Sequence, residues 1–212
     1  MPKDKSKTDR RIVEAAYYLF YRRGFTRVGV DEIAARAGIT KRTLYSHFRS
    51  KDDLLAAALT RHHELDLERL QSFARHLPED PEAMVESFFD QLLEWAATPR
   101  WSGSGFTRLA VELADLPGHP ARAIAARAKG VTESWLTSLL AKGGVASAAE
   151  MARAIMLLME GAMALMLIHG DRTYGRSAAG IAGALVSAAA SPAGDRAGSG
   201  RRANAGPSRR RR

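Results

Sequence analysis

The chain has 212 residues, of which 46% are hydrophobic and 26% charged, an ordinary composition for a globular protein of one large or two smaller domains. It contains no cysteine, which excludes disulfides and cysteine-ligated metal sites and is compatible with a reducing cytoplasm. The first residues, M-P-K-D-K-S-K-T-D-R-R, are charged and lead into no short apolar region, so we expect no secretory signal.

The net charge of +9 is distributed unevenly. Residues 1–51 contain 13 Lys/Arg and 5 Asp/Glu, residues 52–190 contain 12 and 17, and residues 191–212 contain 7 and 1. Positive charge at both ends of an acidic middle indicates a polyanionic partner at the ends. A merely solvated surface would also explain these charges. At the N-terminal end a merely solvated surface is the weaker interpretation, because the positive charge there coincides with a short helix that would fit into a DNA groove.

Helical periodicity runs along almost the whole chain and predicts an all-α fold. The first helix is expected over 8–23, where Ile12, Ala16, Leu19 and Phe20 share an inward face before Gly24 ends it. The residues before it, 1–7, are expected to form a disordered basic tail.

Residues 30–51 predict a helix-turn-helix. After a first short amphipathic helix, Gly38 supplies the left-handed residue that ends it, and Thr40 is the expected N-cap of the second helix. In the second helix Leu44 and Phe48 lie four residues apart and bury together. This arrangement turns outward the polar side chains of Arg42, Thr43 and Ser46. A helix of about two turns that is buried on one face and carries cationic and polar groups on the other fits a DNA major groove.

The rest of the chain is expected to be helical up to residue 190. Ser50 is the predicted N-cap of a long fourth helix that continues to about residue 76. Pro78 and Pro81 mark a boundary between an N-terminal domain over 8–55 and a C-terminal domain over 80–190. Further helices are expected over 82–97, 106–115, 121–141, 147–168 and 173–190.

Residues 191–212 contain nothing to bury and should be a disordered basic tail. The four arginines at 209–212 either add non-specific phosphate contacts or form a solvated end without a function.

The most apolar segment, residues 155–168, carries Glu160 as its only charge. A membrane span needs about 20 apolar residues, so we expect no membrane association. The segment is either the core of a monomer or, as we favour, part of a four-helix interface of a homodimer. The helix after it is rich in Ala and Gly, which allow close packing, and residues 147–190 are therefore the expected dimer surface.

The stretch A-G-I-T-K-R-T-L-Y-S-H-F-R-S-K-D-D-L at 37–54, preceded by G-F-T-R-V-G-V-D-E-I-A at 24–34, resembles the TetR family of bacterial transcriptional repressors. The resemblance is specific over residues 8–55 and weaker beyond them. It implies a cytoplasmic all-helical homodimer, with an N-terminal three-helix DNA-binding domain and a C-terminal helical bundle for dimerisation. It also implies that the dimer binds a pseudo-palindromic operator in double-stranded DNA. The protein would leave this operator when a small molecule occupies a pocket in the bundle.

The resemblance also implies roles for single residues. Arg42 is the candidate for reading a guanine edge, with Thr43 and Ser46 beside it on the bases. Where the family usually has two Thr/Ser residues before the first motif helix, this chain has Val28-Gly29, so one backbone contact is missing and Arg27 is the candidate to replace it. The other positions that match phosphate contacts are Thr40, Lys41, Tyr45, His47 and Lys51.

An aromatic and Met-rich set in the C-terminal half suits an adaptable apolar pocket for a small hydrophobic or amphipathic ligand. Each member alone is an ordinary core residue, and the resemblance rather than the pattern favours the pocket. Glu160 either hydrogen-bonds a neighbouring helix, which we favour, or faces the ligand. The other members of the set are Phe88, Phe89, Trp95, Phe106, Trp135, Met156, Met159 and Met163.

Two other classes of protein are weighed against a ligand-responsive regulator. A helical enzyme using Glu160 with a histidine has no nucleophile–base pair or phosphate loop at a usable spacing. The histidines also lack ligand spacing, so we expect no metal site and no cofactor. A DNA-binding architectural protein without a ligand would have a dry, fully packed C-terminal half.

Overall fold

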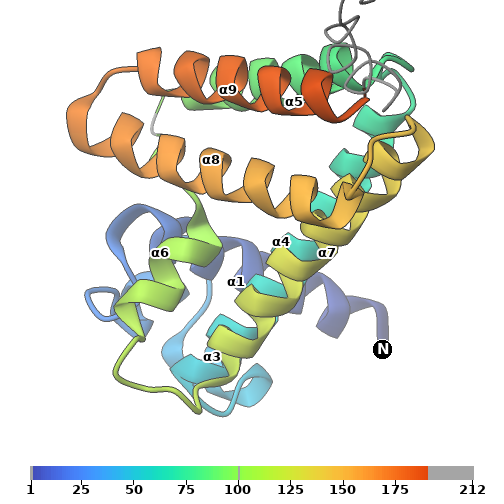
Figure 1. Cartoon of the computed structure of the whole chain (residues 1–212). Helices are drawn as coiled ribbons and strands as arrows, with labels where there is room; N and C mark the ends of the chain where they lie inside the picture. The colour runs from blue at the N-terminus through green and yellow to red at the C-terminus, as the bar shows by residue number, and fades with distance from the viewer. Residues whose placement is uncertain (1, 100, 191–212) are drawn as a thin grey trace, which may run out of the picture.

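The computed structural model describes residues 2–99 and 101–190, which form helices joined by turns, and this confirms the all-α class (Figure 1). The predicted tail over 191–212 lies outside the described residues. The helices are α1 (Pro2–Arg23), α2 (Val30–Ala37), α3 (Lys41–His47), α4 (Lys51–Ala74), α5 (Pro81–Ala96), α6 (Gly105–Glu112), α7 (Pro120–Lys142), α8 (Ala148–His169) and α9 (Thr173–Ala190).

The first helix is longer than the sequence pattern predicts. It begins at Pro2, so the expectation of a disordered tail over 1–7 is wrong for residues 2–7. A proline in the first turn of a helix loses no hydrogen bond, because its missing N–H would have had no helical partner. The following residues contain no glycine and no second proline that would end the helix before Thr8.

The caps of the DNA-binding motif are those that the sequence predicts. Gly38 ends α2 in the left-handed conformation, with φ 65° and ψ 41°. The Thr40 hydroxyl accepts a hydrogen bond from the Thr43 N–H at 3.1 Å and so begins α3. Ser50 does the same for α4 through the Asp53 N–H at 3.0 Å. Short-range signals alone therefore set the ends of the three elements that position the motif.

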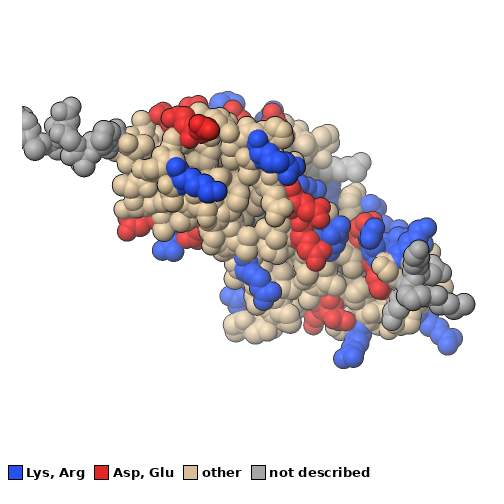
Figure 2. Space-filling model, turned by 90° about the vertical axis from the view of Figure 1, so that its right-hand side faces the viewer, with Lys and Arg blue, Asp and Glu red and all other residues tan. Residues whose placement is uncertain are grey.

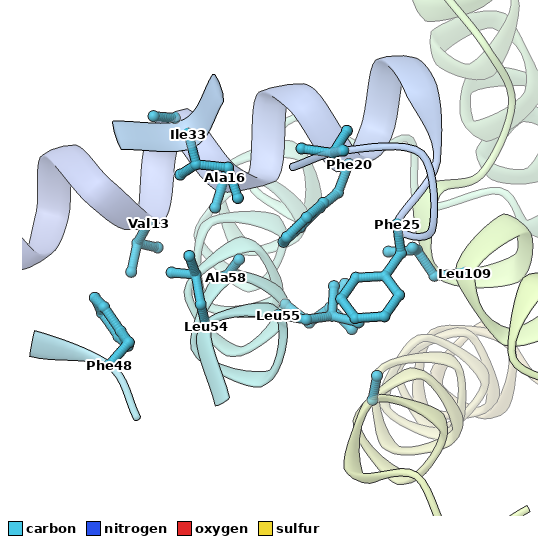
Figure 3. Close-up of a cluster of buried hydrophobic side chains, with 14 of the residues drawn as sticks. Val13, Ala16, Phe20, Phe25, Ile33, Phe48, Leu54, Leu55, Ala58 and Leu109 are labelled. Carbon is cyan, nitrogen blue, oxygen red and sulfur yellow. The ribbon is translucent and has the colours of Figure 1, made fainter. Parts of the chain in front are cut away.

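A lower core holds α1–α4 together and also takes in α6 and the first half of α7. Phe20 and Leu54 are fully buried where α1 packs on α4, and Leu44 fastens α3 beneath them. Figure 3 shows Phe25, from the loop after α1, next to Leu109 of α6. The lower core thus continues past the predicted boundary at Pro78 and Pro81, because α6 packs directly on the N-terminal helices.

An upper core is formed by α5, α8, α9 and the second half of α7, with Phe89, Leu136, Leu140 and Ile155 fully buried. In Figure 1, α8 and α9 run side by side across the top of the molecule, and α4 and α7 descend from this layer to the DNA-binding motif. By length and composition α8 could cross a membrane. Its inner face, however, contributes seven buried residues to the upper core.

Candidate DNA-contacting surface and ligand cavity

The recognition helix α3 turns a polar face to solvent. Leu44 is fully buried and fixes the helix from behind, while Arg42 and Ser46 are exposed and Tyr45 is 46% exposed. Arg42 makes no ion pair with any residue of 2–99 or 101–190, so its guanidinium is available to a partner. The Ser46 hydroxyl donates to the Thr43 carbonyl at 2.7 Å. This face carries the groups that the sequence predicted for it.

The start of α3 is also accessible. Lys41 Nζ lies 3.0 Å from Asp31 Oδ2, and both side chains are more than half exposed. Such a pair contributes little to stability and is easily exchanged for a phosphate. Thr40 and Arg27 are exposed as well, Arg27 in the loop that leads to α2. Figure 2 shows basic side chains over the lower part of the molecule with acidic ones among them, and both signs of charge on the upper part as well.

Two predicted phosphate contacts are placed differently from the expectation. The His47 imidazole is 11% exposed and its Nδ1 meets Asp9 Oδ1 of α1 at 2.5 Å. Lys51 Nζ lies over the Phe25 ring, 4.3 Å from its centroid, and burial lowers the pKa of this ammonium group. Both side chains fasten the motif to neighbouring elements. Their role at DNA stays a prediction.

A contact that the sequence did not predict holds the turn of the motif. Arg11 of α1 donates through Nη2 to the carbonyl oxygens of Ala37 and Gly38, where α2 ends. A side chain 26 residues away in sequence thus satisfies a helix C-terminus and ties the turn to the first helix. Packing and hydrogen bonds together present α3 as a rigid unit.

A cavity of about 580 Å³ lies between the two cores and opens beside α1, α4, α5, α6, α7 and α8. Five residues of the predicted ligand set line it, namely Phe88, Trp95, Phe106, Met159 and Met163. The other three apolar members, Phe89, Trp135 and Met156, lie in the upper core instead. Phe89 is fully buried and Met156 is 8% exposed there, and the Trp135 ring contacts Phe73 and Phe88. A dry, fully packed C-terminal half, as expected of an architectural protein, is not what the structure has.

The sequence pattern did not predict the part of the cavity wall that α1 and α4 supply. Tyr17 and Tyr21 of α1, and His62, His63 and Asp66 of α4, all line it. Their spacing was a usable signal, because the two tyrosines are four residues apart and Asp66 follows His62 by four, which places each pair on one helical face. The residues were not predicted because the ligand set was taken only from the C-terminal domain expected over 80–190, which α1 and α4 precede.

Ring contacts organise this wall. Tyr17 stacks on Tyr21 with centroids 6.0 Å apart and on His62 with centroids 3.8 Å apart, and His62 is 5.6 Å from the Phe106 ring. Burial, then the charge of Arg69 and the neighbouring His63, lower the pKa of His62 to about 4, so the His62 imidazole is neutral at physiological pH. Burial also raises the pKa of Tyr17, whose hydroxyl stays protonated.

Glu160 is part of a hydrogen-bonded network, which agrees with the structural role that we favoured for it. Its carboxylate accepts from the Thr107 hydroxyl at 2.6 Å and pairs with Lys129 Nζ. The same ammonium donates to Ser104 Oγ at 3.0 Å, and Ser104 caps α6. The network joins the first turn of α6 to α7 and α8. Glu160 itself faces a second cavity of about 600 Å³ on the other side of α6.

The far end of α6 is fastened to the DNA-binding half. The Glu112 carboxylate accepts hydrogen bonds from the backbone N–H groups of Phe25 and Thr26, both at 2.8 Å, and from the Thr26 hydroxyl at 2.5 Å. Gly24, in the left-handed conformation with φ 86°, brings the loop this close, since a Cβ there would lie 3.1 Å from a Glu112 oxygen. One short helix thus connects the cavity with the loop that leads into the motif.

An apolar face remains uncovered on α8 and α9. Six of the ten exposed large hydrophobic residues in the described part of the chain lie on these two helices. On α8, Leu157, Leu165 and Ile168 are spaced by eight and three residues and share one face, and on α9 Ile181 and Leu185 are four apart. Contiguous apolar surface of this kind marks an interaction site.

Known proteins resemble the chain in sequence and in fold. Residues 12–58 match the family model of bacterial regulatory proteins of the tetR family. The chain is 31% identical over 147 residues to the transcriptional repressor SCO4008 of Streptomyces coelicolor, which covers 65% of this chain and 72% of that protein. It is 37% identical over 93 residues to the transcriptional activator FasR of Mycolicibacterium smegmatis, a match that spans only 42% of each protein.

Two solved structures share the fold over nearly their full length. The TetR-family regulator SCO4454 of Streptomyces coelicolor superimposes with a TM-score of 0.79 at 24% identity, covering 87% of this chain and 97% of that one. A TetR regulator of Chloroflexus aurantiacus does so with a TM-score of 0.76 at 23% identity, covering 87% and 96%. Regulators of this family bind DNA and act as dimers. The chain therefore belongs to the TetR family of bacterial regulatory proteins, and it is a helix-turn-helix transcriptional regulator, not an enzyme.

Proposed function

We propose that this chain is a cytoplasmic repressor that binds a pseudo-palindromic operator as a homodimer and is released by a small molecule in the cavity between its cores. The observation that carries the proposal is the recognition helix α3, which buries Leu44 and exposes Arg42. Repression is favoured over activation because the relative named a repressor matches a much longer part of the chain than the relative named an activator.

The proposed domain division keeps residues 8–55 as the DNA-binding domain and residues 80–190 as the part for ligand and partner. The uncovered apolar face of α8 and α9 supports a dimer through residues 147–190. Two recognition helices in such a dimer would read half-sites about 34–36 Å apart or a multiple of this spacing. A ligand that favours another spacing, with a coupling of about 1–3 kcal/mol, would change operator affinity about 5–150-fold.

At the DNA, we propose that Arg42 reads a base edge, with Thr43 and Ser46 beside it. The exposed Thr40, Lys41, Tyr45 and Arg27 are proposed to position α3 on the phosphates. His47 and Lys51 can contribute there only as far as their contacts to Asp9 and Phe25 allow. In the cavity, we propose that Phe88, Trp95, Phe106, Met159 and Met163 contact the ligand.

The base-reading role of Arg42 predicts a sequence-dependent loss. Arg42→Ala should weaken binding to the operator by about 1–3 kcal/mol and relax the preference at one base-pair position in each half-site. The operator is obtained by selecting bound fragments from genomic DNA with the purified full-length protein. Affinities of the native and variant proteins are then measured on the operator, on single-base variants of it, and on random DNA.

The matched control is Arg49→Ala, which removes an equally exposed arginine just beyond α3. This variant should lose no more affinity for the operator than for random DNA, because Arg49 lies beyond the helix proposed to read the bases. An equal loss on both DNAs for Arg42→Ala would remove Arg42 from the base-reading role. If the native protein selects no DNA at all, the proposed function itself is wrong.

A further inference from the structure

The charges around the 580 Å³ cavity neutralise each other within the protein. Asp66 lies 3.0 Å from Arg69 Nη1 and 3.2 Å from His62 Nε2. Lys129, on the opposite wall, pairs with Glu160. His62 is neutral at physiological pH for the reasons given above. A ligand therefore meets two internally compensated ion pairs, not a free charge of either sign.

An ionised ligand would be costly to bind against such a wall. A cation would have to attract Asp66 away from the partners it already has, and an anion would have to do the same with Lys129. Desolvating a charge that stays imperfectly paired costs more than the remaining attraction returns. The aromatic rings favour a cation by themselves, but the neutral His62 and the already paired Asp66 add no free negative charge to that attraction.

The cavity offers stacking surface, and the Tyr17 hydroxyl supplies an unused hydrogen-bond donor beside it. Tyr17 and His62 stack with centroids 3.8 Å apart and an interplanar angle of 22°, and the Phe106 ring lies 5.6 Å from His62. The Tyr17 hydroxyl has no hydrogen-bond partner within residues 2–99 and 101–190. It lies against the start of α6, where a Cβ on Gly105 would be 2.9 Å away. A ligand oxygen at this point would satisfy the hydroxyl and touch α6 at once.

We propose that the cavity selects an uncharged, flat aromatic molecule that carries an oxygen acceptor, such as a ketone, and presents it to the Tyr17 hydroxyl. The proposal rests on the proposed function, in which this cavity holds the effector. It adds the chemical class of that effector and the residue that recognises its polar end. Because the acceptor binds beside Gly105, the polar end of the ligand contacts the helix whose other end is fastened to the DNA-binding half through Glu112.

Four naphthalene derivatives of similar size test the proposal: 2-acetylnaphthalene, 2-ethylnaphthalene, 2-naphthoate and 2-(aminomethyl)naphthalene. Their affinities for the full-length protein are measured at pH 7 by isothermal titration calorimetry without DNA. The acetyl compound should bind at least about tenfold more tightly than either ionised compound. It should also bind about three- to tenfold more tightly than the ethyl compound, which is the contribution of one hydrogen bond.

Two variants identify the residues responsible. Tyr17→Phe keeps the stacked ring and should make the acetyl and ethyl compounds bind equally. Lys129→Gln removes the ammonium group from the cavity wall and should raise the affinity of the aminomethyl compound about tenfold or more. Lys142→Gln, the same substitution at an exposed position of the same helix, should leave all four affinities unchanged.

The proposal is overturned if an ionised compound binds native protein as tightly as 2-acetylnaphthalene, if neither neutral compound binds, or if Tyr17→Phe preserves the preference for the ketone. These outcomes concern binding in the absence of DNA. Failure of the proposed function would appear separately, as a protein that selects no genomic fragment.

Discussion

Placing glutamate at both Leu157 and Ile181 should convert the protein into a folded monomer. These side chains are 71% and 52% exposed in the single chain and lie on the uncovered faces of α8 and α9. In a four-helix interface formed with a second copy, two-fold symmetry would bring four new carboxylates into an apolar contact that excludes water. An unpaired charge buried at an interface costs several kcal/mol, more than a modest dimer contact can offset.

Loss of the dimer should weaken operator binding about 10²–10⁴-fold, because a monomer no longer gains from having its second recognition helix tethered beside the second half-site. Analytical ultracentrifugation measures the association state, and operator affinity is measured on the same samples. The far-UV circular dichroism spectrum and the melting temperature should change little, since neither side chain contributes to the upper core.

The matched control for this variant is Leu116→Glu. Leu116 is 50% exposed in the turn between α6 and α7, away from α8 and α9. It should remain dimeric and bind the operator as the native protein does. A dimer that persists in the double variant would show that another surface joins the two copies. A native protein that is monomeric at micromolar concentration would contradict the proposed interface directly.

The elements that the sequence predicts well are those whose signals are local. Gly38, Thr40 and Ser50 each act on backbone groups within four residues, so a sequence read in short windows is enough to place the ends of α2, α3 and α4. The outward face of α3 follows in the same way, because burying Leu44 leaves Arg42 and Ser46 on the other side.

The features that sequence alone did not predict depend on residues far apart in the chain. Tyr17 joins the cavity because α1 packs on α4, which brings it against His62, and its spacing from Tyr21 indicates a shared helical face but not the partner of that face. His47 and Lys51 turn toward Asp9 and Phe25 for the same reason. A helical pattern fixes which face of a helix is apolar. It does not determine which partner that face meets.

Glu112 makes another of these long-range contacts, and we expect that removing it weakens the coupling between the cavity and the DNA-binding motif. Glu112 holds the N–H groups of Phe25 and Thr26 across 87 and 86 residues of sequence. Glu112→Ala should lower the free energy of unfolding by about 1–3 kcal/mol, the usual contribution of hydrogen bonds to a charged group. It should also accelerate hydrogen exchange at the Phe25 and Thr26 amides, since both lose their acceptor. Amide exchange monitored by NMR or mass spectrometry and thermal unfolding measure these effects.

Acidification should also lower the stability of the native protein, because it protonates Glu112. Burial raises the pKa of Glu112, but the hydrogen bonds from Thr26 and Phe25 outweigh it and leave the pKa below its usual value. A carboxyl group whose pKa is lowered by folding stabilises the protein above its unfolded pKa of about 4.3, and this contribution is lost as the pH falls through the lower folded value. The difference in stability between native protein and Glu112→Ala should therefore be constant near neutrality and shrink below about pH 4.

Asp115→Ala is the control, because it removes an exposed carboxylate three residues further on. It should change neither amide exchange at Phe25 and Thr26 nor unfolding.

In Glu112→Ala an effector found by its ability to release the operator should still bind the cavity, whereas its effect on operator affinity should fall toward none. The reason is that α6 would keep its contacts at Ser104 and Thr107 but lose its hold on the loop before α2. An effector that released the operator equally well from this variant would show that coupling runs through α4 or α7 instead, the two long helices that also join the upper layer to the motif.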